Sequence, residues 1–313
     1  MATLGIVMPV FNGEKYVSQT IESIIASTVQ PNHLVLVNDG STDATLDCAK
    51  KALASANFKF DIVSQRNSGE ATAVNVGVKR LDADYLIIVN ADDPIDPDLI
   101  KYTSQALDLN PSAVVAYPDW RVIDEDGLLI REVKTQDFSR ELLYGGFVCI
   151  PGPGAAIRAS AIRGELRDPR FSHVADYGTW LKLAIEGDFV RIEKVLANWR
   201  DHSQGQTAQG KGTLLAEQYV NLIDQFFEAK TLPSEIMSFR ELGKASARFQ
   251  AAVQGLFRAG VRSKSLVCQA LVIGKGALPR GASLPLVAAI IALPFSRWGL
   301  KAYYGARKSL KLD

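Results

Sequence analysis

The chain has 313 residues, 47% of them hydrophobic and 22% charged, and its formal net charge at pH 7 is +1. This composition is typical of a globular protein with a large core, and the length suits one large domain or two. Proteins that bind nucleic acids usually carry a clear excess of positive charge. The net charge of this chain is close to zero, so we expect no nucleic-acid partner.

The N-terminal stretch MATLGIVMPV has neither a basic start nor a long apolar run. We therefore expect no secretory signal peptide and a cytoplasmic protein. The three cysteines, Cys48, Cys149 and Cys268, lie far apart and lack the spacing of metal ligands. We interpret them as small buried hydrophobic residues in a reducing compartment.

Residues 4–110 alternate between short apolar runs and segments with helical periodicity. The apolar runs predict strands at GIVMPVF (5–11), HLVLVND (33–39), FDIVSQ (60–65) and DYLIIVN (84–90). The periodic segments predict helices within 12–27, 44–56, 67–81 and 97–107. Before the second helix, Asp39-Gly40 forms the expected turn, and Ser41 or Thr42 is the expected N-cap.

This alternation predicts an α/β fold, with a mainly parallel sheet and helices on both of its faces. Ligands of such sheets bind beyond the carboxyl ends of the strands. The expected ends are polar or acidic, at residues 9–12, 38–40, 65–67 and 90–93. The sequence therefore predicts the mouth of a binding pocket at this edge.

The second half of the chain gives more mixed signals. Residues 113–130 indicate a hairpin that turns at Asp126-Gly127, and residues 145–162 indicate a Gly/Pro-rich connection followed by a strand. A helix is expected to end at Gly187, followed by a strand pair or one extended strand over 189–202. After Gly210, helices are expected within 213–230, 234–260 and 263–278.

Four carboxylates, Asp92, Asp93, Asp96 and Asp98, fall within seven positions directly after an apolar run. Like charges this close repel one another, so water, a cation or the start of a helix must offset them. Helix capping is the preferred interpretation for Asp96, whereas Asp92 is the better candidate for a cation ligand.

Five stretches occur in an order that is similar to one known family: IVMPVFNGEKYVSQTIESI, VLVNDGSTDAT, NSGEATAVNVG, YLIIVNADDPIDPDLI and ADYGTWLKLA. Together they resemble glycosyltransferase family 2, whose members are inverting enzymes of the GT-A fold that use nucleotide-diphosphate sugars. The resemblance covers residues 4–205, about two thirds of the chain. It implies a catalytic GT-A domain over 1–210 and a helical C-terminal region over 211–313.

The resemblance implies a divalent cation, Mn²⁺ or Mg²⁺, that neutralises the departing diphosphate. Asp92 matches the metal-binding aspartate of the family, and Asp93 is expected to hold a metal-bound water. His202 is expected to reach the metal or the diphosphate, with a surface or packing role as the alternative. The family pattern usually begins with aspartate where this chain has Asn90, so we expect weaker metal binding.

The resemblance also implies donor-binding residues. Asp39 matches the residue that hydrogen-bonds the base, with a turn-forming role as the alternative or in addition. Arg66 matches a basic residue near the nucleotide, with an exposed solvated arginine as the alternative. The remaining expected donor contacts are Pro9, Val10, Phe11 and Asn12 in the nucleoside pocket, Glu14 at the ribose or base, Asn90 and Ala91 beside Asp92, and Arg200 at the phosphates.

The stretch ADYGTWLKLA matches the part of the family that binds the acceptor. Inverting transfer needs a base that deprotonates the acceptor hydroxyl, and Asp176 takes that position. Ala175 replaces a glutamate that the family has there. The alternative is that Asp176 is simply a helix N-cap.

The last segment combines an apolar run, SLPLVAAIIALPF, with a basic end that carries Arg297, Lys301 and Arg307. The run is too short to span a bilayer, for which about 20 residues are needed. It suits either peripheral contact with the inner face of the plasma membrane or a buried terminal helix. Membrane contact fits a lipid-linked acceptor, with a saccharide acceptor as the other choice.

The sequence therefore predicts a metal-dependent transferase, with a UDP-sugar as the expected donor, that acts in surface polysaccharide or glycolipid synthesis. The alternative is a catalytically silent nucleotide-sugar-binding or scaffold protein on the same fold, which Asn90 and Ala175 would permit. A dinucleotide oxidoreductase is disfavoured because no G-x-G-x-x-G turn follows the first strand.

Overall fold

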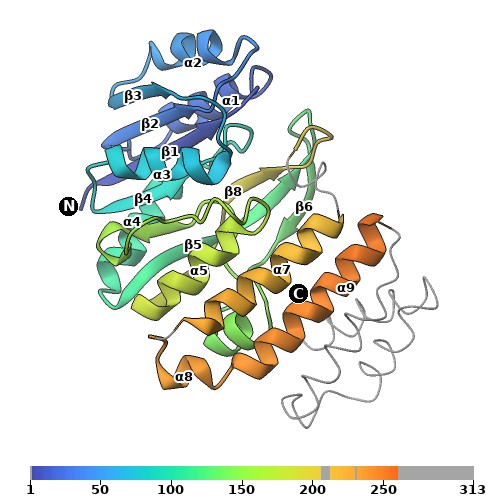
Figure 1. Cartoon of the computed structure of the whole chain (residues 1–313). Helices are drawn as coiled ribbons and strands as arrows, with labels where there is room; N and C mark the ends of the chain where they lie inside the picture. Colours follow the sequence, from blue (N-terminus) through green and yellow to red (C-terminus); the bar gives the residue numbers. More distant parts are fainter. Residues whose placement is uncertain (1, 206–211, 230, 260–313) are drawn as a thin grey trace. The chain divides into compact units, whose positions relative to one another are not determined.

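The computed structural model describes residues 2–205, 212–229 and 231–259 (Figure 1). These residues form two compact units. The first contains the described residues up to Phe138 and those from Cys149 to 205, and the second contains Ser139–Val148 and the described residues from 212 onward. No signal in the sequence indicates that Ser139–Val148 belongs to the same unit as the C-terminal helices. The expected helix at 263–278 and the terminal apolar and basic segment lie outside the described residues.

The first unit is built on a mixed sheet of eight strands within the described residues, in the order β3-β2-β1-β4-β7-β5-β6, with β8 paired to β5. The strands β3, β2, β1 and β4 are parallel to one another, whereas β7 is antiparallel to both β4 and β5. The strand bounds are Leu4–Val10 (β1), His33–Asn38 (β2), Lys59–Ser64 (β3), Tyr85–Ile88 (β4), Ala113–Ile123 (β5), Leu129–Val133 (β6), Ala156–Arg158 (β7) and Asp188–Arg200 (β8). The predicted α/β fold with a mainly parallel sheet is confirmed.

Helices cover both faces of the parallel part, as the alternation predicts. The helices of this unit are α1 (Val17–Ile25), α2 (Thr45–Leu53), α3 (Glu70–Arg80), α4 (Leu99–Leu109) and α5 (Ala175–Glu186), with a short 3₁₀ turn η2 (Ala159–Ala161). Ile6 and Leu34 share one apolar cluster with α1, α2 and α4. The next residue along β2, Val35, packs on the other face with Ala73 of α3. Successive side chains of a strand point to opposite faces, so these strands are buried on both sides.

Two glycines of the NSGEATAVNVG stretch have different structural roles. Gly69 has a positive φ of 87° and no atom within 4 Å of where a Cβ would lie, so it permits the backbone conformation that starts α3. A tight approach occurs at Gly77, where a Cβ would lie against Val7 Cγ1. Gly77 therefore lets α3 pack closely on β1.

Of the two alternatives expected for residues 189–202, the structure has the one extended strand, β8, which runs parallel to β5. The expected N-cap of α2 is corrected by the structure. The side chain at the start of α2 is that of Asp43, whose Oδ1 accepts the Thr45 backbone N–H at 3.0 Å. Ser41 and Thr42 instead bond to Asn12, because the loop after β1 lies against them.

The second unit contains α7 (Gly212–Glu228), α8 (Ser234–Met237), α9 (Arg240–Ala259) and a π-helical turn, η1 (Glu141–Gly145). The ring of Tyr144 in η1 stacks on Phe226 of α7 at 5.6 Å between centroids. Asp224 of α7 pairs with Arg248 of α9 at 2.7 Å. No helix among the described residues is both long enough and apolar enough to cross a bilayer.

A buried ion pair fastens β5 to β8. The Asp119 carboxylate, with only 6% of its side chain exposed, accepts hydrogen bonds from the Arg191 guanidinium at 3.0 Å and from the Thr135 hydroxyl at 2.7 Å. Removing one member of such a pair leaves the other charge buried without compensation.

We expect Asp119→Asn to lower the free energy of unfolding by about 3 kcal/mol, because Arg191 loses its buried counter-charge. The matched control is Glu165→Gln, which breaks the exposed pair with Lys79 and costs less than about 1 kcal/mol. Urea unfolding curves of both variants measure the difference. Equal losses in the two variants would contradict this ranking.

Candidate active site

Two loops at the carboxyl edge of the parallel strands are fastened to each other by side-chain hydrogen bonds. Asn12, which has a positive φ of 49°, accepts the Thr42 N–H on its side-chain oxygen at 2.9 Å. Glu14 accepts the Ala44 N–H at 2.9 Å, and Asp43 accepts the Glu14 N–H at 3.2 Å. The loop after β1 is therefore held rigidly against the loop after β2.

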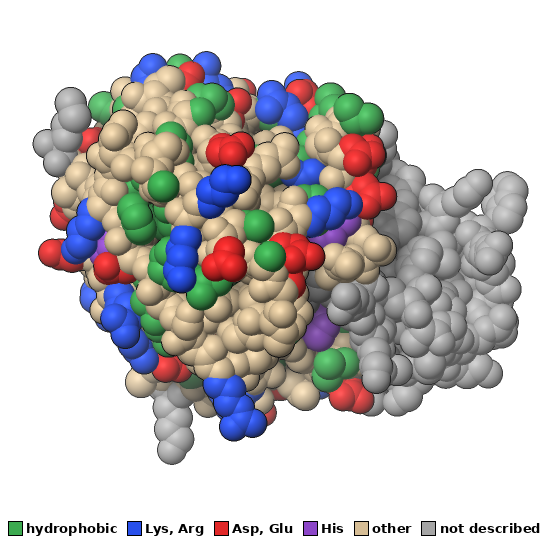
Figure 2. Space-filling view, turned by 90° about the horizontal axis from the view of Figure 1, so that it is seen from above, with side chains coloured by type: hydrophobic (Ala, Val, Ile, Leu, Met, Phe, Trp, Pro, Cys, Tyr) green, Lys and Arg blue, Asp and Glu red, His purple; other side chains and the backbone are tan. Residues whose placement is uncertain are grey.

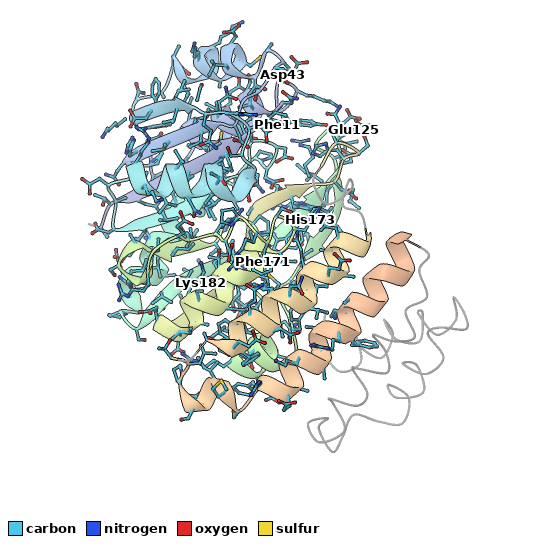
Figure 3. All side chains as sticks on the ribbon, in the orientation of Figure 1. Phe11, Asp43, Glu125, Phe171, His173 and Lys182 are labelled. Carbon is cyan, nitrogen blue, oxygen red and sulfur yellow. The ribbon has the colours of Figure 1, made fainter. Side chains whose placement is uncertain are left out.

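The residues predicted to line the nucleoside pocket lie at this edge. Pro9 and Val10 are buried in β1, whereas the Phe11 side chain beyond the strand end is 51% exposed. Figure 3 shows Phe11, Asp43 and Glu125 at the same end of the sheet. An exposed aromatic ring beside polar loops offers a face on which a planar base can stack.

The Asp39 carboxylate is almost fully engaged within the protein. It is 3% exposed, and it accepts hydrogen bonds from Gln65 Nε2 at 2.7 Å, Ser68 N at 2.9 Å and Gly69 N at 2.8 Å. A carboxylate has about four acceptor positions, so one remains for a ligand. Asp39 thus fixes the loop between β3 and α3, and the expected contact with the base depends on that last position.

Asp92 and His202 meet beyond the end of β4. His202 Nε2 lies 3.0 Å from Asp92 Oδ2, and 34% of the Asp92 side chain is exposed. The imidazole is only 8% exposed and packs edge-on against Tyr16 at 5.0 Å between centroids. Segments that lie 110 residues apart in sequence thus bring a carboxylate and an imidazole to one accessible point.

This pair fits a divalent cation. Two neighbouring ligands of an octahedral ion, each about 2.1 Å from it, lie about 3 Å apart, and that is the separation of the two side-chain atoms. Among the residues that the structure describes, no group of three or more His, Cys, Asp and Glu side chains could hold a metal. Donor phosphates and water would therefore complete the coordination, as is usual for Mg²⁺.

Asp93 does not face the same point as Asp92. It is buried, its Oδ1 accepts the Arg200 backbone N–H at 2.8 Å, and its Oδ2 accepts Asn90 Nδ2 at 3.0 Å. Burial, followed by the nearby Asp92 charge, raises the pKa of Asp93 to about 8. The structure thus assigns Asp93 to joining the ends of β4 and β8, and the expected role in holding a metal-bound water does not fit this position.

The departure from the family pattern at Asn90 has a local explanation. Its amide donates directly to the buried Asp93 carboxylate. An aspartate at this position would lack that donor and would add a negative charge beside Asp92. Asn90 is exposed, Asp92 is partly exposed, and Ala91 between them is buried.

Arg200 is a structural centre of the site rather than a free phosphate ligand. It is 3% exposed, and its guanidinium donates to the carbonyls of Asp92, Asp124 and Glu125 and to Gln19 Oε1, at 2.6–3.1 Å. The cation also lies 4.6 Å from the centre of the Tyr16 ring. Four of its five N–H groups are used, which corrects the expectation that Arg200 contacts the donor phosphates.

The side chains of Arg66 and Asp176 are accessible. Arg66 is exposed on the loop after β3, at the edge that carries Asp39. Asp176 lies exposed in the first turn of α5, where its Oδ1 accepts the Tyr177 N–H at 2.7 Å. Val174 occupies the N-cap position, so the N-cap interpretation of Asp176 is not supported.

The family stretch NSGEATAVNVG contributes another structural residue, Asn75. Its amide donates to the Arg167 carbonyl at 2.7 Å and accepts the Arg167 N–H at 2.9 Å. Asn75 thus satisfies two backbone groups of one residue. The segment before α5 is therefore fixed to α3.

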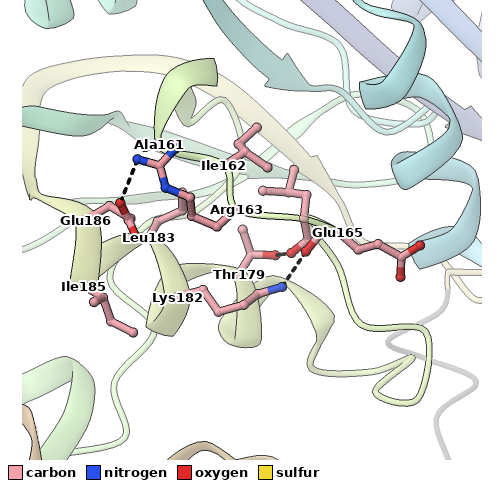
Figure 4. Close-up of a pocket in the computed structure, with 10 residues that line it drawn as sticks. Ala161, Ile162, Arg163, Glu165, Thr179, Lys182, Leu183, Ile185 and Glu186 are labelled. Carbon is pink, nitrogen blue, oxygen red and sulfur yellow. Dashed lines mark hydrogen bonds and ion pairs between the residues drawn. The ribbon is translucent and has the colours of Figure 1, made fainter. Parts of the chain in front are cut away.

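A separate small pocket of about 150 Å³ lies along α5 (Figure 4). Lys182 lines it and donates to the Glu165 carbonyl at 2.7 Å, and burial lowers the pKa of this lysine. None of the residues predicted for the donor or the metal lines this pocket. On the face shown in Figure 2, basic and acidic side chains are interspersed and form no single basic patch.

The sequence and the fold both have known relatives. The model of the family described as "Glycosyl transferase family 2" matches residues 5–163 of this chain. A chondroitin synthase from Escherichia coli is 28% identical over 196 residues, which are 62% of this chain and 28% of that protein. An uncharacterized glycosyltransferase from Rickettsia prowazekii, RP339, is 27% identical over 248 residues, covering 75% of this chain and 74% of that one. The chain spans less than a third of the chondroitin synthase.

Solved structures share the fold at low sequence identity. Residues 1–349 of Staphylococcus aureus TarS, in complex with UDP-GlcNAc, match with a TM-score of 0.64 at 16% identity, covering 99% of this chain and 92% of that one. The mannosyltransferase PcManGT from Pyrobaculum calidifontis, in complex with GDP-Man and Mn²⁺, matches with a TM-score of 0.64 at 14% identity, covering 97% and 83%. The GT-A architecture of these glycosyltransferases is therefore also that of this chain.

The raised pKa of Asp93 makes stability depend on pH. Its ordinary value is 3.8 and its folded value is about 8, so the folded protein binds more protons than the unfolded chain between these values. Stability therefore falls as pH rises from about 4 to about 8. We expect Asp93→Asn, which cannot titrate, to flatten this slope.

Urea unfolding with EDTA at several pH values between 4 and 8 measures the effect. Asp96→Asn is the control from the same acidic segment, and it should keep the slope of the unmodified protein. A slope that Asp93→Asn leaves unchanged would refute the assignment of a buried, proton-binding Asp93.

Proposed function

Because the chain belongs to glycosyl transferase family 2, we propose that it is an inverting, metal-dependent enzyme that transfers a sugar from a nucleotide-diphosphate sugar to an acceptor hydroxyl. The observation that carries this proposal is the pair of Asp92 and His202 at the carboxyl edge of β4. Structural neighbours in complex with UDP-GlcNAc and with GDP-Man support a nucleotide-sugar donor.

In this proposal Asp92 and His202 hold Mn²⁺ or Mg²⁺ together with the donor diphosphate. The bound cation supplies Lewis-acid neutralisation of the charge that the leaving diphosphate acquires. Arg200 keeps the Asp92 backbone in place through its hydrogen bond to the Asp92 carbonyl at 2.9 Å. The complex of the mannosyltransferase neighbour with Mn²⁺ supports this use of the site.

Inversion needs a base on the acceptor side, opposite to the leaving group. Asp176 is our candidate, because it is an exposed carboxylate in the first turn of α5. It would accept the proton of the acceptor hydroxyl as that oxygen attacks the anomeric carbon and the bond to the diphosphate breaks. Ala175 beside it carries no charge, so no second carboxylate precedes the base.

The substrates are proposed from chemistry and relatives together. Phe11, Asp39 and Arg66 border one edge of the sheet, which suits a base and its ribose, and we propose uridine as the base. Relatives named chondroitin synthase and hyaluronan synthase support a saccharide acceptor. We further propose action on the cytoplasmic side, with a lipid-linked acceptor as the form that would bring the enzyme to the membrane.

We expect Asp176→Asn to lower transfer at least about 100-fold, since general-base catalysis contributes about 10²–10⁴-fold. Donor binding should be unchanged, as shown by the rise in melting temperature with the donor. The donor is chosen from a thermal-shift panel of UDP-, GDP- and dTDP-sugars.

The matched control for this variant is Asp82→Asn, which changes an exposed carboxylate between α3 and β4. Full transfer activity in Asp176→Asn would refute the role of this base. Donor binding without turnover in the unmodified protein would instead favour a silent nucleotide-sugar-binding protein.

A second prediction concerns the cation. EDTA should abolish donor turnover and added Mn²⁺ should restore it, because Asp92 and His202 need the ion to hold the diphosphate. Asp92→Asn should lower kcat/KM by more than about 100-fold, since even indirect partners of a metal cost about 10–100-fold. Asp98→Asn, from the same acidic segment, should retain activity. Turnover that is unaffected by EDTA would contradict the metal dependence.

A further inference from the structure

Two exposed side chains form an ion pair at the carboxyl edge of the sheet. Lys15, in the turn before α1, donates from Nζ to Oε2 of Glu125, in the turn between β5 and β6, at 2.9 Å. The two side chains are 53% and 62% exposed. Figure 3 shows Glu125 at the same end of the sheet as Phe11. The pair therefore connects two loops that border the proposed donor site.

The Tyr16 ring connects this ion pair with the proposed metal ligands. The Lys15 ammonium lies 5.0 Å from the centre of the ring. The His202 imidazole packs against the same ring, at 5.0 Å between centroids, and its Nε2 lies 3.0 Å from Asp92 Oδ2. A lysine side chain is long and flexible, so the ammonium can turn from Glu125 toward a group that is bound at Asp92 and His202.

The backbone on each side of the ion pair is fixed, so only side chains need to move. The Tyr16 N–H donates to the Gly13 carbonyl at 3.0 Å, which fixes the turn that carries Lys15. The Arg200 guanidinium donates to the Glu125 carbonyl at 3.1 Å. An exposed ion pair contributes little to stability, so the exchange of one acceptor for another costs little. Glu125 therefore keeps the ammonium beside the site and leaves it available to another anion.

The charges of the proposed site require one more cation. A nucleotide-diphosphate sugar carries two negative charges on its phosphates, and the leaving diphosphate acquires another. The Asp92 carboxylate cancels one of the two positive charges of a divalent ion. Arg200 is not free for the phosphates, because four of its five N–H groups donate within the protein. An ammonium forms strong, charge-assisted hydrogen bonds with phosphate oxygens, and Lys15 has one available beside His202.

We propose that Lys15 is a donor-binding residue that leaves Glu125 and hydrogen-bonds the diphosphate of the nucleotide sugar. This inference rests on the proposed function, in which Asp92 and His202 hold the metal and the diphosphate. Lys15 would distinguish a nucleoside diphosphate from the bare nucleoside. Glu125 would compete with the diphosphate for the same ammonium.

The affinities for UDP and for uridine, both measured with Mn²⁺ present, test this inference. Calorimetry gives the Kd of UDP, and competition with UDP gives the Kd of uridine. Lys15→Met keeps the apolar stem but removes the cation, so the Kd of UDP should rise about 10-fold. The Kd of uridine should stay the same, because uridine has no phosphate. Glu125→Gln releases the ammonium, so the Kd of UDP should fall.

Two further variants serve as controls. Lys79→Met removes a lysine from another exposed ion pair, the one with Glu165, and should leave both Kd values unchanged. Lys15→Arg keeps the positive charge and should retain most of the affinity for UDP. If the ion pair serves only to hold the two loops together, Lys15→Met and Glu125→Gln would both weaken UDP and uridine alike.

The outcomes separate this inference from the proposed function. A loss confined to UDP in Lys15→Met, with a gain in Glu125→Gln, supports the inference. Equal losses for UDP and uridine, or no loss for UDP, would overturn it, and the proposed function would stand if binding of UDP still depends on Mn²⁺ and Asp92. If the thermal-shift panel selects GDP or dTDP, that nucleotide and its nucleoside replace UDP and uridine. Failure of the unmodified protein to bind any of the three would remove the proposed function and this inference with it.

Discussion

The site depends on one buried charge, the Arg200 guanidinium at the end of β8. A guanidinium that is 3% exposed must find acceptors within the protein, because an unpaired charge there would cost several kcal/mol. It finds them in the carbonyls of Asp92, Asp124 and Glu125 and in Gln19. The end of β4, the β5–β6 hairpin and α1 are thereby fixed around one point, and Asp92 and His202 meet beside it.

Several residues of the family stretches hold the loops around the site in place and are themselves buried. Asp39 organises the loop between β3 and α3, Asn75 fixes the segment before α5, and Asp93 joins two strand ends. Each does so by accepting hydrogen bonds from, or donating them to, backbone groups of a neighbouring segment. The exposed residues Phe11, Arg66 and Asp176 are then free to meet ligands. Within the same short stretches, some side chains therefore fix the loops and others are exposed to ligands.

The sequence predicted the parallel half of the sheet well because each of its elements has a local signal. Apolar runs, helical spacing and turn residues located β1 to β4 and their helices. The insertion of β7 between β4 and β5, and the parallel pairing of β8 with β5, were not predictable, because they join segments far apart in the chain. For the same reason the sequence indicated that Asp92 and His202 were functional but not that they touch.

The roles of Arg200 and Asp93 show the same limit. Burial decides whether an arginine binds a ligand or holds a loop, and burial depends on the packing of distant segments. The family resemblance implied that Arg200 contacts the donor phosphates, whereas its burial makes it hold neighbouring loops. The metal assignment is a proposal: the 3.0 Å between His202 Nε2 and Asp92 Oδ2 is a hydrogen-bond distance and is also the separation of neighbouring ligands on one ion.

Anomalous diffraction from crystals grown with Mn²⁺ and UDP would locate both the ion and the nucleotide. We expect one strong Mn²⁺ peak in contact with both Asp92 and His202, with the diphosphate completing the coordination and the base beside Phe11. A metal peak away from these two side chains, or a nucleotide bound elsewhere on the molecule, would contradict this expectation.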